Sequence, residues 1–404
     1  MIFFIIPISF VAISPGIFYD AATVLRVILL FFIPLFLFIR KPVNLKQYKF
    51  LVAMFSFLIL VYIISAQLNE QRLIDFVFGA YGRGYGIASL IGFCMLFILS
   101  SSSIAIHSKQ FMKSINVVIL ISLLYGAMQV FKIDPFNWEN NVGVSLTLGN
   151  SNFASAFLGI ISIFPTGNLI YNRSKTWSYS VIILFLCLFL LYKTNSVQGI
   201  FIFLIGSLLL VYHKIRTSKK IIHGELKFAT FLMVCILSGV IYLQSQNKFT
   251  DLVNSTNYLD RLRHFRLALR VLKDNFVFGV GIDSLGTRSA EYLTLDDARA
   301  WGNYGQPDKS HNFILDSLVG GGIVAGLLIS AMYAIIFVIQ LKILHKQANS
   351  IPIGNQIILV VMSQCYLLQT LISPDSIFLF TFGAMLLGSV YGLHLEKSKE
   401  IQKK

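Results

Sequence analysis

Residues 246–309 read QNKFTDLVNSTNYLDRLRHFRLALRVLKDNFVFGVGIDSLGTRSAEYLTLDDARAWGNYGQPDK, and this polar interval interrupts a chain that otherwise alternates apolar runs with short basic turns. It contains a basic amphipathic segment at 260–266 and ends just before Ser310-His311-Asn312. The contrast predicts a membrane protein with one large loop on one side. Several arginines followed by a lone histidine at a helix start indicate chemistry on an anionic substrate at the membrane surface.

The composition is typical of a polytopic membrane protein and excludes an ordinary soluble globular protein. Of the 404 residues, 56% are hydrophobic and 13% charged, and the mean hydropathy is +0.74. A helix needs roughly 20 apolar residues to cross a bilayer. We therefore expect one all-α membrane domain over residues 1–404 with about twelve transmembrane helices. We interpret the first apolar segment, 1–18, as a span and not as a cleaved signal, because no charged segment precedes it. The predicted spans are 1–18, 22–39, 48–67, 85–106, 111–131, 151–171, 176–192, 197–213, 227–245, 311–340, 352–373 and 376–394.

The distribution of basic residues predicts the orientation. Of the 33 Lys and Arg, 19 lie in six short segments that contain only three of the 18 acids. Because Lys and Arg accumulate on the cytoplasmic side, we expect both termini there and the loop at 246–310 on the other side. The net charge of +15 then reflects topology and contact with anionic lipids, not nucleic-acid binding. The six segments are 40–50, 107–113, 172–176, 212–227, 341–351 and 395–404.

An amphipathic helix is predicted within the loop at 261–273, with Asp260 as its N-cap. At about 100° per residue, Arg261 falls on the apolar side of this helix. It either snorkels at the helix end or points its planar guanidinium at the protein body to bind a phosphate. The opposite arc, which we expect at lipid headgroups or in water, contains Arg263, Arg266, Arg270 and Lys273.

The remainder of the loop contains weaker signals. Gly279-Val280-Gly281 allows a tight turn, but without a βαβ unit and a third glycine it does not predict a dinucleotide site. Arg288 is either a solvated charge or a phosphate ligand. Asp308 or Ser310 can cap the next span and place His311 in its first turn. There His311 is either a polar anchor or a general base for a sugar hydroxyl.

These residues resemble the signature of the O-antigen ligase and polymerase family. Arg261-Leu262-Arg263-His264-Phe265 is similar to its Arg-Leu-x-x-aromatic start, and His311-Asn312 to its His-Asn pair at the start of a span. The segment 275–281 resembles its Asn-Pro-x-x-Gly-x-Gly element, with Phe276 where Pro is common. Further segments that resemble the family are 79–84, 148–154 (a Gly-Asn-x-Asn turn) and 194–199, which lacks the Arg of a Ser-Arg-Gly element. The resemblance covers roughly residues 70–335 and is strongest over 258–330.

The resemblance implies a GT-C-like glycosyltransferase of the bacterial inner membrane whose donor is an undecaprenyl-pyrophosphate-linked glycan. The loop at 246–310 would be periplasmic and would carry part of the active site. Arg261 and Arg288 would hold the pyrophosphate, and His311 would serve the acceptor hydroxyl. The acceptor is lipid A-core, a protein Ser or Thr, or a second glycan. We expect an enzyme of the O-antigen ligase type, with a polymerase that joins repeat units as the alternative within the family; a protein glycosyltransferase is not distinguished from these by the sequence.

The sequence favours transfer without a metal ion or other cofactor, because it has no Asp-x-Asp motif and no His-rich set. Fixed arginines would then stabilise the charge of the leaving pyrophosphate. A single displacement in which His311 activates the acceptor would invert the anomeric centre. Arg26 either faces the donor phosphate or snorkels, and Asn150 and Asn152 either bind sugar or cap a helix. The full set of candidate substrate-binding residues is Arg26, Arg83, Asn150, Asn152 and Asn312.

A transporter or flippase for lipid-linked sugars is the competing class of function. An ion-coupled carrier normally has acidic residues within its spans, whereas the acids near spans in this chain lie at their outer ends. That distribution argues against a carrier. No filter-like or charge-ring pattern indicates an ion channel.

Overall fold

The structure is a computed structural model that describes residues 2–13, 23–40, 43–136, 143–171, 177–217, 256–301, 307–345, 351–373 and 375–402. These residues form helices and connecting turns, with no β-strand among them. The predicted all-α class is therefore confirmed for this part of the chain. The predicted span at 227–245 and the first part of the polar loop lie outside the described residues.

Seven of the described helices are long and apolar enough to cross a membrane. The chain is thus an integral membrane protein, but the predicted number of about twelve spans is not confirmed. The seven are α3 (Lys49–Leu68, preceded by the 3-10 turn η2, Leu45–Tyr48), α5 (Ile87–Val130), α6 (Ser151–Tyr171), α8 (Gln198–Thr217), α14 (Phe313–His345), α15 (Ile353–Ile372) and α16 (Ile377–Gln402).

Other apolar helices among the described residues are shorter than these seven. α2 (Val24–Arg40) and α7 (Trp177–Lys193) have 17 residues each. At the N-terminus, only η1 (Ile2–Phe4) and α1 (Ile5–Val11) are described within the predicted 1–18 span. Together these two elements are too short to cross a bilayer, which needs roughly 20 residues.

Helix α5 covers two of the predicted spans, 85–106 and 111–131. Its 44 residues correspond to about 66 Å, roughly twice the thickness of the hydrocarbon core. The helix is broken at His107, where φ is −117° and ψ is 21°. The start of the first arm and the end of the second both lie near the start of α6. Arg83, just before the first arm, lies 5.6 Å from the Phe153 ring of α6. Gln129, near the end of the second arm, accepts the N–H of Leu146, just before α6, at 2.8 Å. The long helix therefore folds back on itself, and its length is sufficient for two crossings of a membrane.

The core between the spans is aromatic and closely packed. The rings of Phe10, Phe157, Phe378 and Phe382 form one group with centroids 4.9 to 6.3 Å apart. α16 also approaches the backbone of α5, where a Cβ on Gly388 would lie 2.3 Å from the Phe97 carbonyl oxygen. A residue without a side chain permits that contact, as is common between membrane helices.

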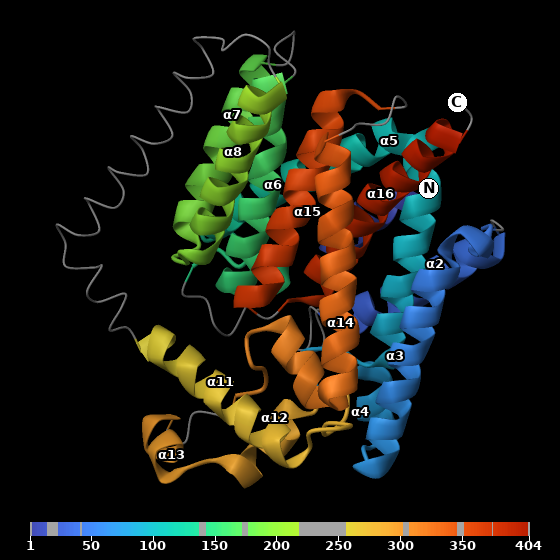
Figure 1. Cartoon of the computed structure of the whole chain (residues 1–404). Coiled ribbons are helices and arrows are strands. Elements are labelled where there is room, and N and C mark those ends of the chain that lie inside the picture. The colour runs from blue at the N-terminus through green and yellow to red at the C-terminus, as the bar shows by residue number, and fades with distance from the viewer. Residues whose placement is uncertain are drawn as a thin grey trace.

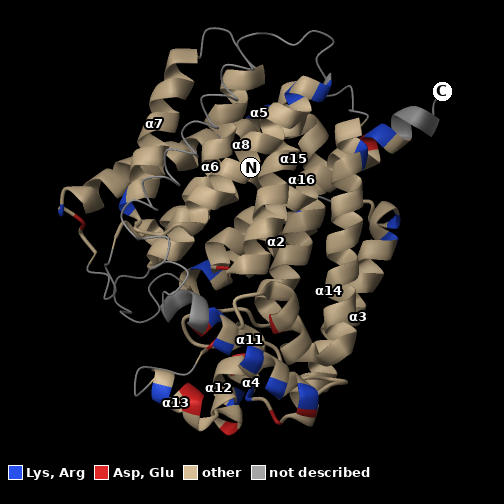
Figure 2. Cartoon of the chain, turned by 60° about the vertical axis from the view of Figure 1, so that its left-hand side comes forward, with Lys and Arg blue, Asp and Glu red and all other residues tan. Residues whose placement is uncertain are grey.

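The short helices gather at one end of the bundle, which we call the loop end (Figure 1). They are α4 (Leu73–Phe78), α11 (Thr256–Asp274), α12 (Leu285–Arg288), the 3-10 turn η4 (Ser289–Tyr292) and α13 (Leu295–Trp301). Charged residues concentrate at this end and at the opposite one (Figure 2).

At the opposite end, segments predicted to be cytoplasmic lie side by side. Lys397 Nζ donates to the Lys342 carbonyl at 3.0 Å, and a nitrogen of Arg216 lies 3.3 Å from His345 Nδ1. Three of the six segments predicted to be cytoplasmic, 212–227, 341–351 and 395–404, thus meet at one end of the molecule in their described parts. We call it the basic end.

Helix α14 is broken near its start, and the break holds the polar loop in place. Gly322 has φ of 68°, a left-handed conformation that glycine adopts readily. The break leaves carbonyls that pair with the glycine turn of the loop: Val280 N–H donates to Val319 O and Gly281 N–H to Gly320 O, both at 2.9 Å. The loop is thereby fixed by its backbone to the first turns of α14.

Candidate active site

The outward face of α11 is partly neutralised by acids. The helix begins at Thr256, so the predicted start at Asp260 is wrong. Asp260 instead accepts a hydrogen bond from Arg263 Nη1 at 3.0 Å. Arg270 pairs with the mostly buried Asp297 of α13. Within the predicted basic arc, the two exposed members are Arg266 and Lys273.

The inward face of α11 directs Arg261 into the protein. Ala268 and Val271 on this face are fully buried. Arg261 Nη1 donates to the carbonyl of Ile372, at the end of α15, at 3.0 Å. Burial lowers the pKa of the Arg261 guanidinium, although arginine remains protonated in proteins. A cation is therefore held beside the ends of α11 and α15.

His311 precedes the helix that it was predicted to begin. α14 starts at Phe313, and Asn312 Oδ1 accepts the N–H of Leu315 at 3.0 Å, as an N-cap does. The predicted caps Asp308 and Ser310 are therefore wrong. Asn312 Nδ2 also donates to the Leu371 carbonyl at 2.9 Å, which ties the cap to α15.

The backbone of His311 is strained. Its φ of 61° lies in the left-handed region, which residues other than glycine seldom adopt. The neighbours hold this conformation: Ser310 N–H donates to Asp316 Oδ1 at 2.7 Å, and Asn312 N–H donates to Ser310 Oγ at 3.3 Å. Strain of this kind is found disproportionately at functional sites.

A second imidazole, which the sequence reasoning missed, lies against His311. The rings of His264 and His311 stack with centroids 4.7 Å apart, and Trp301 lies 5.5 Å from His264. Among the described residues, Nδ1 of each histidine is buried without a hydrogen-bond partner. Helical spacing was the available signal, because His264 follows Arg261 by three residues and lies near it on the helix surface.

The environment of His311 keeps its imidazole neutral. Burial is the largest cause that lowers its pKa, followed by His264, Arg261 and Arg83, and together they outweigh Asp308 and bring the pKa to about 3. Burial also lowers the pKa of His264. A neutral imidazole has a free lone pair at neutral pH and is able to accept a proton.

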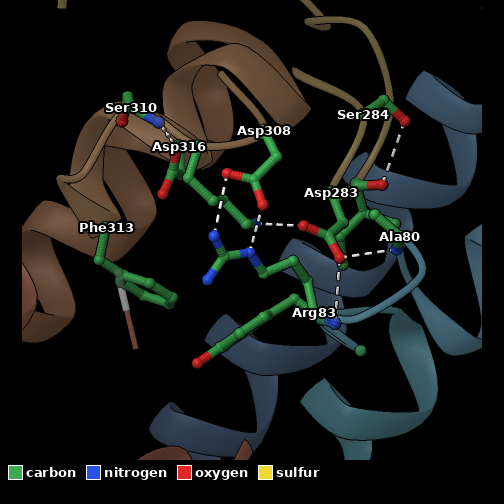
Figure 3. Close-up of polar contacts among 12 residues, drawn as sticks. Ala80, Arg83, Asp283, Ser284, Asp308, Ser310, Phe313 and Asp316 are labelled. Atoms are coloured by element: carbon green, nitrogen blue, oxygen red, sulfur yellow. Dashed lines mark hydrogen bonds and ion pairs between the residues drawn. The ribbon is translucent and has the colours of Figure 1, made fainter. Parts of the chain in front are cut away.

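A charged cluster acts on His311 through Arg83 and Asp308. The cluster consists of two ion pairs, Arg83 with Asp308 and Lys309 with Asp283, and Figure 3 labels three of these residues. Asp283 accepts the backbone N–H groups of Ala80 at 2.8 Å and Tyr85 at 3.1 Å, and pairs with Lys309. Arg83 pairs with Asp308 through two N–H donors. The glycine-rich segment 79–84 is thereby fixed to the residues just before His311.

Within this cluster, Asp308 and Lys309 keep pKa values that favour their charged forms, although Lys309 is buried and Asp308 is half-buried. Burial is the largest single influence and raises the pKa of Asp308, but Arg83, Lys309 and His311 together lower it by more, so the net shift is downward. Burial lowers the pKa of Lys309, but Asp283 and Asp316 raise it, so the net shift is upward. Paired opposite charges offset the cost of removing each from water.

Asn150 and Asn152 adjoin the cluster through Phe153, whose ring lies under Arg83. Asn150 Oδ1 accepts the N–H of Asn152 at 2.8 Å at the start of α6, and both asparagines are exposed. Asn150 therefore caps a helix in this structure. A sugar-binding role for either residue stays a prediction.

Arg288 and Arg26 have partners elsewhere. Arg288 donates to the Asn69 carbonyl at 2.8 Å and pairs with Glu291 at 3.4 Å, and the structure gives it no contact with Arg261 or His311 among the described residues. Arg26 is buried and donates to carbonyls of Ser9, Phe10 and Thr147. Phosphate binding by either arginine stays a prediction.

One protein-family model matches part of the chain. Residues 160–330 match the sequence model described as O-antigen ligase. The chain contains an O-antigen ligase domain. The O-antigen ligase domain runs from α6 into α14 and includes Arg261, His264, Arg288 and His311.

The match confirms the family resemblance from residue 160 onward, and segment 70–159 lies outside it. The match supports glycan transfer of the O-antigen ligase or polymerase type as the general activity. No curated protein matches the chain. The charged cluster links the two regions, because Arg83 lies before the O-antigen ligase domain and Asp308 within it.

Proposed function

We propose that the protein transfers a glycan from undecaprenyl pyrophosphate to an acceptor hydroxyl at its loop end. The observation that carries this proposal is the meeting of His311 with Arg261 and Arg83, which come from three separate segments of the chain. Both guanidinium groups act electrostatically on His311, after burial and His264. A neutral base close enough to two cations to be affected by both matches a reaction in which a hydroxyl loses a proton and a phosphate gains negative charge.

In the proposed step, the acceptor oxygen attacks the anomeric carbon of the donor sugar. The bond from that carbon to the pyrophosphate oxygen breaks, and its electron pair leaves with the lipid pyrophosphate. His311 takes the proton of the attacking hydroxyl. Attack from the side opposite the leaving group inverts the anomeric configuration.

Arg261 and Arg83 would stabilise the leaving group. Arginine has five N–H donors in a planar arrangement that matches phosphate oxygens. Arg261 donates Nη1 to Ile372, and Arg83 uses Nε and Nη2 for Asp308. Each guanidinium retains further N–H groups for a substrate oxygen, and fixed cations at a developing charge lower the barrier.

The proposed orientation places the loop end in the periplasm and the basic end in the cytoplasm of the bacterial inner membrane. The grouping of Lys342, Lys397 and Arg216 at one end supports it, since basic residues are retained on the cytoplasmic side. The lipid-linked donor would then approach from the outer leaflet.

The test is transfer by the purified protein in proteoliposomes that contain a defined undecaprenyl-pyrophosphate glycan, with the product measured by mass spectrometry. Loss of a general base or of one charge-stabilising donor costs about 10²- to 10³-fold in rate. We expect losses of that order for His311→Ala and Arg261→Ala. Arg266→Ala, on the exposed face of the same helix, is the matched control and should retain the rate.

The acceptors distinguish the remaining possibilities. Product on added lipid A-core indicates a ligase, and product on a second lipid-linked glycan indicates a polymerase. Full transfer by folded His311→Ala or Arg261→Ala would overturn the assignment of these residues. Movement of the donor across the bilayer without any product would indicate the carrier instead.

A further inference from the structure

Helix α4 packs Phe76 and Val77 against the bundle but leaves other apolar side chains exposed. Its six residues, Leu73–Phe78, include none that is buried. Leu73 is 75% exposed and Ile74 63% exposed. Exposed large apolar side chains that neighbour one another indicate an interaction surface or a membrane contact. α4 follows the last turn of α3, where Leu68 is also exposed.

A second exposed apolar segment leads out of α11. Phe276 is 53% exposed and Val277 52% exposed. The Phe276 carbonyl accepts the N–H of Ile323 at 2.8 Å, so the segment is fixed to α14. One turn further along α14, Leu327 is exposed as well. The side chains of this segment therefore extend the lipid-facing surface of α14 toward the loop end.

The two segments belong to one surface because α3 and α14 are neighbours. Ser65 Oγ donates to the Gly320 carbonyl at 2.8 Å, and Asn69 Nδ2 donates to the Gly279 carbonyl at 3.0 Å. These bonds join the end of α3 to the break in α14 and to the glycine turn after Val277. We call the exposed residues Leu68, Leu73, Ile74, Phe276 and Val277 the apolar fringe.

We propose that the apolar fringe inserts into the acyl-chain region of the leaflet at the loop end, with the phospholipid as its partner. The fringe continues the exposed apolar sides of two membrane-spanning helices, which already face lipid. Its polar neighbour Arg72 is exposed and pairs with Asp75 at 2.7 Å. A cationic side chain beside an apolar helix face is typical of interfacial segments, in which the cation lies at the phosphate level.

The apolar fringe is attached directly to the charged cluster through hydrogen bonds on both sides of α4. Gln71, between Leu68 and Leu73, donates to the Ile282 carbonyl at 2.7 Å, next to Asp283. After α4, the backbone of Ala80 donates to Asp283 itself. Acyl chains that contact α4 would therefore reach the edge of the cluster, where a lipid-linked substrate could approach laterally. Insertion of the fringe does not depend on the proposed reaction.

The test measures the depth of spin labels in proteoliposomes of phosphatidylethanolamine and phosphatidylglycerol. Ile74→Cys and Phe276→Cys each receive a nitroxide, and Leu295→Cys on α13, where the leucine is 77% exposed, is the matched control. The unsubstituted protein, labelled in parallel, measures the background from native cysteines. Collision rates are recorded with oxygen, which enters lipid, and with a water-soluble nickel chelate.

We expect oxygen to collide more often than the chelate at positions 74 and 276, and the reverse at position 295. If positions 74 and 276 behave like 295, the fringe lies in water and the proposal is overturned. Low collision rates with both reagents at 74 and 276 would show that protein covers the fringe, which also overturns it.

Discussion

The imidazole of His264 lies nearly parallel to that of His311, with ring centroids 4.7 Å apart and ring planes inclined by 25°. The contact joins the middle of α11 to the residue before the cap of α14. Two imidazolium ions in this arrangement would repel each other, so the stack favours neutral rings. The orientation of His311 therefore depends on α11 as well as on its own strained backbone.

The pH dependence of transfer should differ between the free and the substrate-bound enzyme. Burial, His264 and the arginines lower the pKa of His311 to about 3. The base then stays neutral as the pH falls through 6.5, and kcat/KM should persist to about pH 4. Bound pyrophosphate is negative and favours imidazolium, which raises the pKa. The acid limb of kcat should thus lie at higher pH than that of kcat/KM; coincident limbs near pH 6.5 would contradict the assignment.

Substitution of His264 should separate its stacking surface from its ring nitrogens. His264→Phe keeps a flat ring against His311, and we expect its kcat to fall by no more than about 3-fold. His264→Ala removes the surface and should lower kcat by about 10- to 100-fold with little change in the donor KM, because misplacement of a reacting group costs rate. The measurement is steady-state transfer by both variants. An equal loss in both would mean that a nitrogen of His264 contacts the substrate.

The buried pair of Lys309 and Asp283 should be strongly coupled. Lys309→Met or Asp283→Asn alone leaves a buried charge without its partner, and each should lower the free energy of unfolding by about 3–5 kcal/mol. The double variant should cost clearly less than the sum of the two. Denaturation in detergent micelles measures this coupling. Arg299→Ala, which removes an exposed pair with Asp296, is the control, with an expected change below about 1 kcal/mol. Additive losses would argue against a direct pair.

Arg26 should prove to be a structural residue. Its guanidinium donates to the carbonyls of Ser9 at 2.8 Å, Phe10 at 2.9 Å and Thr147 at 2.7 Å. Arg26→Met leaves these carbonyls unsatisfied, and an unsatisfied buried group costs about 1–3 kcal/mol. We expect a lower midpoint of thermal unfolding and an unchanged donor KM in the fraction that remains folded. A raised donor KM at unchanged stability would instead support the predicted contact with phosphate.

The sequence by itself determined that this protein crosses the membrane repeatedly, and it grouped three basic segments that meet at the basic end. Both properties follow from local quantities, the length of apolar runs and the position of Lys and Arg along them. Helical periodicity also placed Arg261 on the inward side of α11, since the angle between successive side chains is fixed. The signature around Arg261 and His311 was sufficient to indicate the family.

Only the tertiary structure decided what these side chains meet. The stack of His264 on His311, the pair of Asp283 with Lys309 and the carbonyls around Arg26 join residues that are far apart along the chain. The capping of α14 by Asn312 and not by Asp308 or Ser310 depends likewise on its anchor at Leu371. Such contacts are set by how helices pack and where glycines break them, and neither is encoded in the period of a single helix.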